Sequence, residues 1–371
     1  MKKTLIFVGA CLVGMLLGAG GAALATGKAV DFGNVALEVT VILVSIFLSV
    51  FIHIVAHEAG HLLCGLISGY RFVSFRIGSF TLINDKGHLR VKRFKIAGTG
   101  GQCLMSPPKN VPLEQVPTML YNAGGVLMNV LLSTIALLLC LSLPKEGHDI
   151  LRETLMGFAI IGYALALLNG IPLKMGGVAN DGYNMLFLRK DRQGTRDFAI
   201  QLLFNEQAQN GSTPSEMPAE WFDENPNLNP ADPIQANTEL MRAAREIDMK
   251  QHDAAIARIE KLIAHGKMIP LLLNEARCSL AMVYFSVGET NKAAAIIDKP
   301  LTDYMRVHAS VMPDKQAILA VKAYLVDGDR AEAERVLAHL EQHTDDFLLS
   351  GDAKCSAAFL RDILNQQQQC N

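Results

Sequence analysis

The sequence contains few charged residues, a single tryptophan and no closely paired cysteines. Only 19% of its 371 residues are charged, whereas 50% are hydrophobic, and the formal net charge is −2. A near-neutral chain without a basic run interleaved with aromatic residues is a poor candidate for binding nucleic acid. The seven cysteines are scattered singly and none forms a CxxC pair, so neither a disulfide framework nor a cysteine-based zinc site is expected.

The apolar residues are concentrated before about residue 190. Four stretches there are long enough to span a bilayer, which takes roughly 17–25 residues. They cover about 4–25, 35–56, 123–143 and 151–173. The sequence therefore predicts a mostly α protein: a polytopic membrane helical bundle of about four spans with a small β-hairpin, followed by a soluble α-helical repeat domain.

The first apolar stretch has two interpretations. It follows Lys2 and Lys3 and ends in Ala23-Leu24-Ala25, which is also the pattern of a secretory signal peptide. Its length favours a retained anchor. Both interpretations place the next residues outside the cell.

The basic residues between the second and third spans set the expected orientation. They are Arg71, Arg76, Lys86, Arg90, Lys92, Arg93 and Lys95. Because cytoplasmic loops carry an excess of lysine and arginine, this segment is expected in the cytoplasm. The protein is then a multi-pass protein of the cell membrane whose C-terminal domain is cytoplasmic.

Two segments of this basic region, FVSFRIGSFTL and HLRVKRFKI, are rich in β-formers. Between them, residues 84–87 read NDKG, a turn signal. The pattern predicts a β-hairpin at the membrane surface, over residues 72–96.

A metal-binding pattern lies at the end of the second span, where residues 57–61 read HEAGH. On a helix His57 and His61 share a face and can hold one ion, while Glu58 is placed to take a proton from a water molecule. Ionisable groups in an apolar helix are costly and usually mark function. His53 is too far along the helix to join the same ion, because the outer histidines are separated by about 12 Å. We expect it to be a supporting or pore-lining group.

A third protein ligand is needed, because a catalytic zinc usually has three. After the fourth span the first acidic residue is Asp181. The second and fourth spans both run inward, so Asp181 is expected at the level of the histidines. The alternative is that Asp181 caps a helix that begins near Tyr183.

These motifs resemble those of the site-2 protease family of intramembrane zinc metallopeptidases. The matching residues are the HEAGH motif at 57–61, Gly125-x-x-x-Asn129, Asn169-x-x-Pro172 and Asp181-Gly182, in the order of the family. The resemblance covers about residues 35–190. Two departures are Asn180, where the family commonly has leucine, and an apparent insertion at residues 175–178.

The resemblance implies one Zn²⁺ per chain, held by His57, His61 and Asp181, with Glu58 as the general base. It also implies that Asn129 and Asn169 contact the substrate backbone or the developing oxyanion; the alternative is that they only join helix to helix. The hairpin over residues 72–96 would hold a membrane-anchored protein or peptide substrate by main-chain pairing.

The sequence predicts four regions. They are residues 1–34 (anchor or signal peptide and external loop), 35–190 (membrane peptidase core), 191–233 (linker) and 234–371 (cytoplasmic helical repeats). Within the last region the pattern Tyr284-x3-Gly288-x4-Ala293 recurs 40 residues later, and a looser copy places Ala255 in register with Ala293. This region resembles tetratricopeptide-type repeats, which bind a cytoplasmic protein partner; the alternative is a bundle that only stabilises the chain.

Two functions remain open at this stage. The first is a membrane zinc endopeptidase acting on a membrane-spanning substrate, in regulated proteolysis or in the processing of signal-peptide remnants. The second is a non-catalytic membrane scaffold that recruits a cytoplasmic partner through its helical repeats. The retained Glu58 favours the enzyme. A metal-handling membrane protein would need more histidines and carboxylates along its spans than this sequence has.

Overall fold

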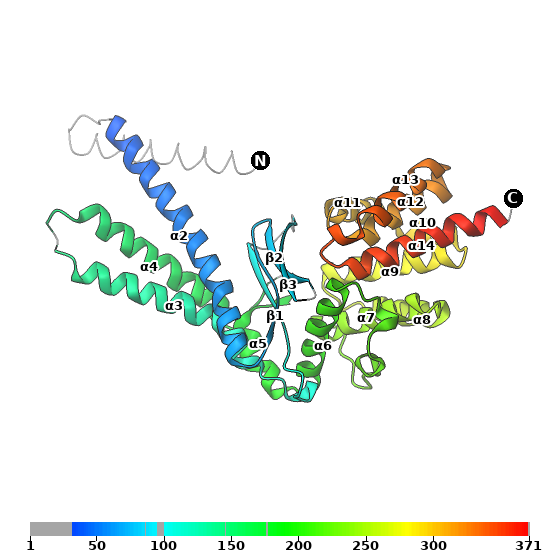
Figure 1. Cartoon of the computed structure of the whole chain (residues 1–371), viewed down its shortest axis with the longest axis horizontal. Coiled ribbons are helices and arrows are strands. Elements are labelled where there is room, and N and C mark those ends of the chain that lie inside the picture. The colour runs from blue at the N-terminus through cyan, green and yellow to red at the C-terminus, as the bar shows by residue number, and fades with distance from the viewer. Residues whose placement is uncertain (1–31, 86, 95–99, 145, 176, 370–371) are drawn as a thin grey trace. The chain divides into compact units, whose positions relative to one another are not determined.

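The computed structural model is mostly helical and contains one four-stranded sheet (Figure 1). It describes residues 32–85, 87–94, 100–144, 146–175 and 177–369. The apolar stretch at 4–25 lies outside these residues, as does its interpretation as an anchor or a signal peptide.

Three of the described helices are long and apolar enough to cross a membrane. They are α2 (Phe32–Ile67), α3 (Thr118–Ser142) and α4 (Asp149–Gly170). They correspond to the second, third and fourth predicted spans. Large apolar side chains on them face outward, as on Phe47, which is 70% exposed. Such surface is stable in lipid and costly in water.

The chain divides into two compact units. The first comprises residues 32–54 and 129–166 of the described chain, and the second comprises residues 55–128 and everything from 167 onward. Each of the three long helices runs from one unit into the other. The candidate site and the helices of the region predicted to be soluble, here called the soluble helices, all belong to the second unit.

The sheet of the second unit is antiparallel, with strand order β3-β2-β1-β4. Its strands are β1 (Arg71–Ile77), β2 (Phe80–Asp85), β3 (His88–Arg93) and β4 (Gly101–Ser106). The predicted hairpin is present as β2 and β3, but FVSFRIGSFTL is two strands rather than one. It turns at Gly78, whose φ is +58°, a conformation that glycine adopts readily. Strand β4 was not predicted.

The segment expected to be a linker, residues 191–233, contains helix α6 (Arg192–Gln209). Helix α6 packs Ala199 and Leu202 into one core with Cys103 and Met105 of β4. Two short 3-10 helices follow, η3 (Pro214–Glu216) and η4 (Ala219–Phe222), and η4 buries the only tryptophan, Trp221. This segment therefore packs along much of its length rather than acting as a free linker.

The soluble helices form pairs around one large hydrophobic core. They are α7 (Pro233–Asp248), α8 (His252–Ala264), α9 (Pro270–Ser286), α10 (Thr290–Ile296), α11 (Lys299–His308), α12 (Pro313–Asp327), α13 (Arg330–Gln342) and α14 (Ser350–Gln369). The helical pattern predicted for this region is confirmed.

The repeated sequence pattern corresponds to a repeated turn. Gly288 follows α9 and Gly328 follows α12, both with positive φ (+80° and +78°). The alanine five residues after each glycine, Ala293 or Ala333, is fully buried. In the looser copy the turn position is Lys250, the only described non-glycine residue with positive φ (+61°).

Candidate metal centre

Helix α2 places two imidazoles one turn apart. His57 and His61 lie on the same face, and their Nε2 atoms are 3.1 Å apart. The helix continues through both residues to Ile67, so their spacing is fixed by the backbone hydrogen bonds of the helix.

The ring of His61 is oriented by helix α3. The Nδ1 of His61 lies 2.8 Å from the carbonyl oxygen of Tyr121, and because a carbonyl only accepts, Nδ1 carries the proton. Nε2 is then the atom available to a metal. A backbone carbonyl that fixes the tautomer in this way is common for metal-binding histidines. Sequence reasoning did not identify Tyr121, because its contribution comes from the backbone.

Asp181 reaches the histidines because the preceding insertion folds as a hairpin. Strands β5 (Lys174–Met175) and β6 (Val178–Ala179) pair antiparallel, so the extra residues turn back on themselves. The side chain of Asn180 then ties the end of the hairpin to the chain before it and to α5. Its oxygen accepts hydrogen bonds from the N–H groups of Leu173 and Tyr183, and its amide nitrogen donates to the carbonyls of Leu168 and Ile171. The cap of helix α5 (Asp181–Phe187) is Asn180 and not Asp181.

Gly182 is needed for the same approach. A Cβ atom at Gly182 would lie 2.1 Å from the carbonyl oxygen of Gly170 and 3.0 Å from that of Asn169. At Gly182 the backbone of α5 thus lies directly against the backbone at the end of α4. Any side chain at this position would push Asp181 away from the histidines.

The three side chains converge on one point. The Oδ2 of Asp181 lies 3.1 Å from Nε2 of His57 and 3.3 Å from Nε2 of His61. Ligand atoms about 2.0–2.2 Å from a tetrahedral zinc ion lie about 3.3 Å from one another. Among the described residues this is the one group of three histidine, cysteine, aspartate or glutamate side chains close enough to hold an ion. The cluster can therefore hold a metal, and its donor set and spacing fit zinc.

Asp181 is ionised in this position. Burial raises the pKa of its carboxyl group, but the interactions with the adjacent rings of His57 and His61 outweigh burial and bring the pKa to about 2. An anionic carboxylate beside two imidazoles is a donor set that attracts a divalent cation.

Glu58 points to the start of strand β4. A Cβ atom at Gly101 would lie 2.6 Å from Cγ of Glu58 and 2.8 Å from its Oε1, so only glycine lets the strand pass so close. The neighbouring Cys103 is a neutral thiol, because burial and the charge of Glu58 raise its pKa to about 12. Glu58 thus lies next to His57 in the chain and against the backbone of β4.

Two glycines bring helices α2 and α3 into backbone contact. A Cβ atom at Gly60 would lie 2.1 Å from the carbonyl oxygen of Gly124, and one at Gly124 would lie 2.2 Å from that of Gly60. The next residue, Gly125, faces the ring of His57, which a Cβ would approach to 2.4 Å. The glycine of the Gly-x-x-x-Asn motif therefore makes room for the ring of His57.

The remaining predicted residues make other contacts. In the first unit, the Oδ1 of Asn129 lies 3.3 Å from Nδ1 of His53, whose Nε2 lies 3.1 Å from the carbonyl oxygen of Phe158. His53 is fully buried and joins these helices by hydrogen bonds. In the second unit, the backbone of Asn169 contacts Gly182. The contact with His53 favours the helix-joining interpretation of Asn129, and its full burial makes His53 a supporting group rather than a pore-lining one.

A scan against protein-family models and searches of curated proteins and of solved structures found no match to this chain. The likeness to the site-2 proteases therefore depends on the motifs and on the geometry of the site.

Proposed function

We propose that this chain is an intramembrane zinc metallopeptidase of the site-2 protease type. The observation that carries the proposal is the convergence of His57, His61 and Asp181 at the distances expected for one tetrahedral ion, with Glu58 beside them. A bound zinc ion would supply Lewis acidity, which makes a water molecule a nucleophile at neutral pH and polarises the scissile carbonyl.

Glu58 is the proposed general base. It would accept a proton from the attacking water and then donate it to the leaving amine, the role of the glutamate in HExxH peptidases. A non-catalytic scaffold has no use for a carboxylate beside two metal-binding imidazoles. The scaffold alternative therefore has less support from this site.

The proposed substrate is a membrane-anchored protein or peptide that pairs with the sheet before cleavage. Peptide bonds inside a helix are shielded, so the substrate must be unwound, and main-chain pairing with a sheet edge achieves this. Strand β4 is better placed for this than the predicted hairpin over residues 72–96. It begins at Gly101, against Glu58, and Gly100 and Gln102 there are exposed.

The proposed location is the cell membrane, with α2, α3 and α4 as spans and the soluble helices in the cytoplasm. This orientation follows from the basic segment between α2 and α3. Fusion of reporter domains after Asp149 and after residue 369 tests it. A cytoplasmic signal from the first fusion, or an external signal from the second, would contradict it.

Cleavage by the purified full chain in detergent tests the activity. A panel of membrane-anchored peptides is incubated with wild type, with Glu58→Gln and with chelator-treated wild type, and the products are identified by mass spectrometry. The proposal predicts cleavage by the untreated wild type alone. Equal cleavage in all three samples would exclude a zinc peptidase, and cleavage by none of them would favour the scaffold.

A further inference from the structure

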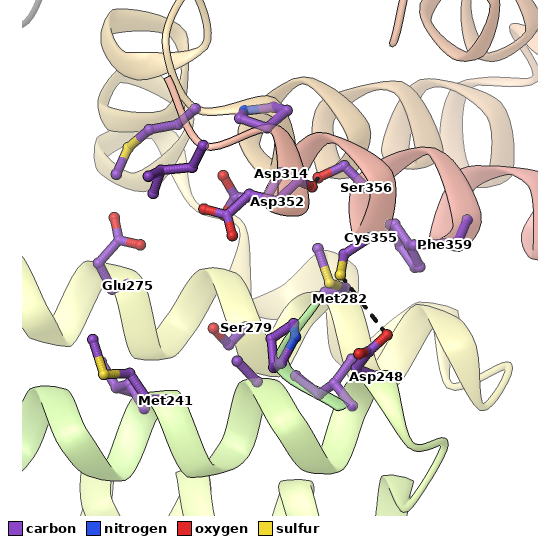
Figure 2. A pocket seen from close by; sticks show the side chains of 18 of the residues that line it. Met241, Asp248, Glu275, Ser279, Met282, Asp314, Asp352, Cys355, Ser356 and Phe359 are labelled. Atoms are coloured by element: carbon purple, nitrogen blue, oxygen red, sulfur yellow. Dashed lines mark hydrogen bonds between the residues drawn. The ribbon is translucent and has the colours of Figure 1, made fainter. Parts of the chain in front are cut away.

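A second built site lies among the soluble helices. Helices α7, α9 and α14 and the first turn of α12 enclose a cavity of about 350 Å³ (Figure 2). The volume is that of a small ligand pocket. Neither the metal site nor the membrane helices contribute to its wall.

Carboxylates are concentrated on one side of this cavity. Figure 2 shows Glu275, Asp314 and Asp352, from three different helices, around the same space. The fully buried Lys315 compensates two of them: its Nζ lies 2.7 Å from Glu275 and 2.6 Å from Asp314. Glu275 also accepts a hydrogen bond from the hydroxyl of Tyr304.

Asp352 is left without a partner. No hydrogen bond or ion pair joins its carboxylate to a described residue. Burial raises its pKa to about 7, and the charges of Asp314 and Glu275 oppose the pull of Lys315. Asp352 is partly buried, and a partly buried carboxylate without a partner is destabilising, so its position facing a cavity points to a ligand that supplies the missing positive charge.

The other charged groups on the wall are already occupied. Asp248 accepts from the backbone N–H of Ser215 and from the thiol of Cys355, and Lys250 pairs with the exposed Asp362. The cavity therefore repels an anion. It is also not a metal site by geometry, because the only three-ligand cluster among the described residues is the one at Asp181.

The rest of the wall is apolar. Met241, Met282 and Phe359 line the cavity beside the carboxylates (Figure 2). Methionines adapt to ligands of varied shape. A small free amine would satisfy Asp352 but leave this apolar surface uncovered, whereas a basic side chain flanked by apolar residues covers both.

We propose that this cavity binds a lysine or arginine side chain of a partner peptide, with the cation on Asp352 and the flanking apolar residues on Met241, Met282 and Phe359. The proposal names the kind of ligand that the helical-repeat region binds, and it does not depend on peptidase activity.

Binding is tested with the full chain in detergent, in a Glu58→Gln background so that no peptide is cleaved. Two peptide libraries serve as probes: each has randomised apolar residues around a fixed central position, which is lysine in one and uncharged norleucine in the other. We expect the lysine library to be retained at least tenfold more than the norleucine library. Equal retention would overturn the proposal.

Three variants locate the binding. Asp352→Asn keeps the shape of the side chain and removes its charge, and Ser279→Leu narrows the cavity without changing its charge. In both variants the ratio of lysine-library to norleucine-library retention is expected to fall at least tenfold. The control Glu341→Gln removes an exposed carboxylate on α13 and should behave as the parent protein. Trp221 fluorescence checks that each variant is folded. Unchanged retention by Asp352→Asn, or displacement of the peptides by an equimolar amount of butylamine, would refute the proposed site.

Discussion

Among the described residues, the candidate metal centre and the wall of the cavity both contain carboxylates, but the two sites are organised in opposite ways. At the metal centre, Asp181 and two imidazoles turn their ligand atoms toward one point, with no lysine or arginine side chain among them. In the cavity of the soluble helices, the one charge of Lys315 is shared by Glu275 and Asp314, and Asp352 has no ion-pair partner among the described residues.

The difference shows how the arrangement of donors selects a ligand. Atoms about 3 Å apart around one centre suit a compact divalent ion. In the cavity the carboxylates are spread over one wall, Lys315 already lies among them, and apolar side chains surround them. Such a wall suits an organic cation whose charge is attached to a hydrocarbon chain. Variants that remove one group from either cluster test this comparison.

The largest effect is expected from Glu58→Gln. Loss of a general base typically lowers turnover by about 10²–10⁴-fold, while the side chains proposed to hold zinc are unchanged. The measurement is the cleavage rate of a membrane-anchored peptide, together with zinc per chain by elemental analysis. Glu341→Gln should cleave at the parent rate. Loss of zinc in Glu58→Gln would show that this carboxylate is a ligand instead.

The next effect is expected from Asp181→Ala. Loss of a supporting residue around a metal typically costs 10–100-fold in affinity, so loss of a direct ligand should weaken zinc binding by about 100-fold or more. Competition with a fluorescent chelator measures it. The control Asp303→Ala removes an exposed carboxylate on α11. Unchanged affinity in Asp181→Ala would remove this residue from the ligand set.

A pH-dependent effect on the free energy of unfolding is expected from Asp352. The folded state raises its pKa from 3.8 to about 7, so its contribution to stability is full below about pH 4 and is lost as the pH rises through 7. The upper bound is about 4 kcal/mol. Urea unfolding followed by Trp221 fluorescence should show the free energy of unfolding falling between about pH 4 and pH 7 and levelling off above pH 7. Asp352→Asn should flatten this dependence, and an equal slope in both proteins would contradict it.

The smallest effect is expected at the repeated turn. Gly328→Ala should lower the free energy of unfolding by about 1 kcal/mol, because a Cβ strains a residue with φ of +78°. No atom lies within 4 Å of that Cβ, so crowding is not the cause. Gly288→Ala should match it, and Gly328→Asn should cost less, because asparagine tolerates this conformation. Equal costs for alanine and asparagine would point to another cause.

The sequence predicted the elements that follow a local period. Three apolar helices, the paired soluble helices and the turn glycines all follow from patterns within a few residues. Strand β4 was missed because it is short and uncharged, and its pairing with β1 is visible only once the fold is formed. Helix α6 was recognised as an amphipathic segment but assigned to a linker, because its core partners come from β4.

At the metal centre, the helical period explains why His57 and His61 meet. The position of Asp181 next to the histidines cannot be predicted from sequence spacing. It depends on the pairing of β5 with β6 and on the hydrogen bonds of Asn180. Two further glycines beside the site mark close approaches: Gly101 lies against Glu58, and Gly124 lies against the backbone of Gly60.

The two outer strands of the sheet differ in charge. Strand β3 carries exposed His88, Arg90 and Arg93, whereas β4 carries no charged residue. Charged side chains on an outer strand discourage other strands from joining it. A guest strand would therefore enter from the β4 side and, if it kept the alternating direction of the sheet, would run the same way as β1. The polarity of a captured chain, and so which of its ends leaves first, would be decided before any bond is broken.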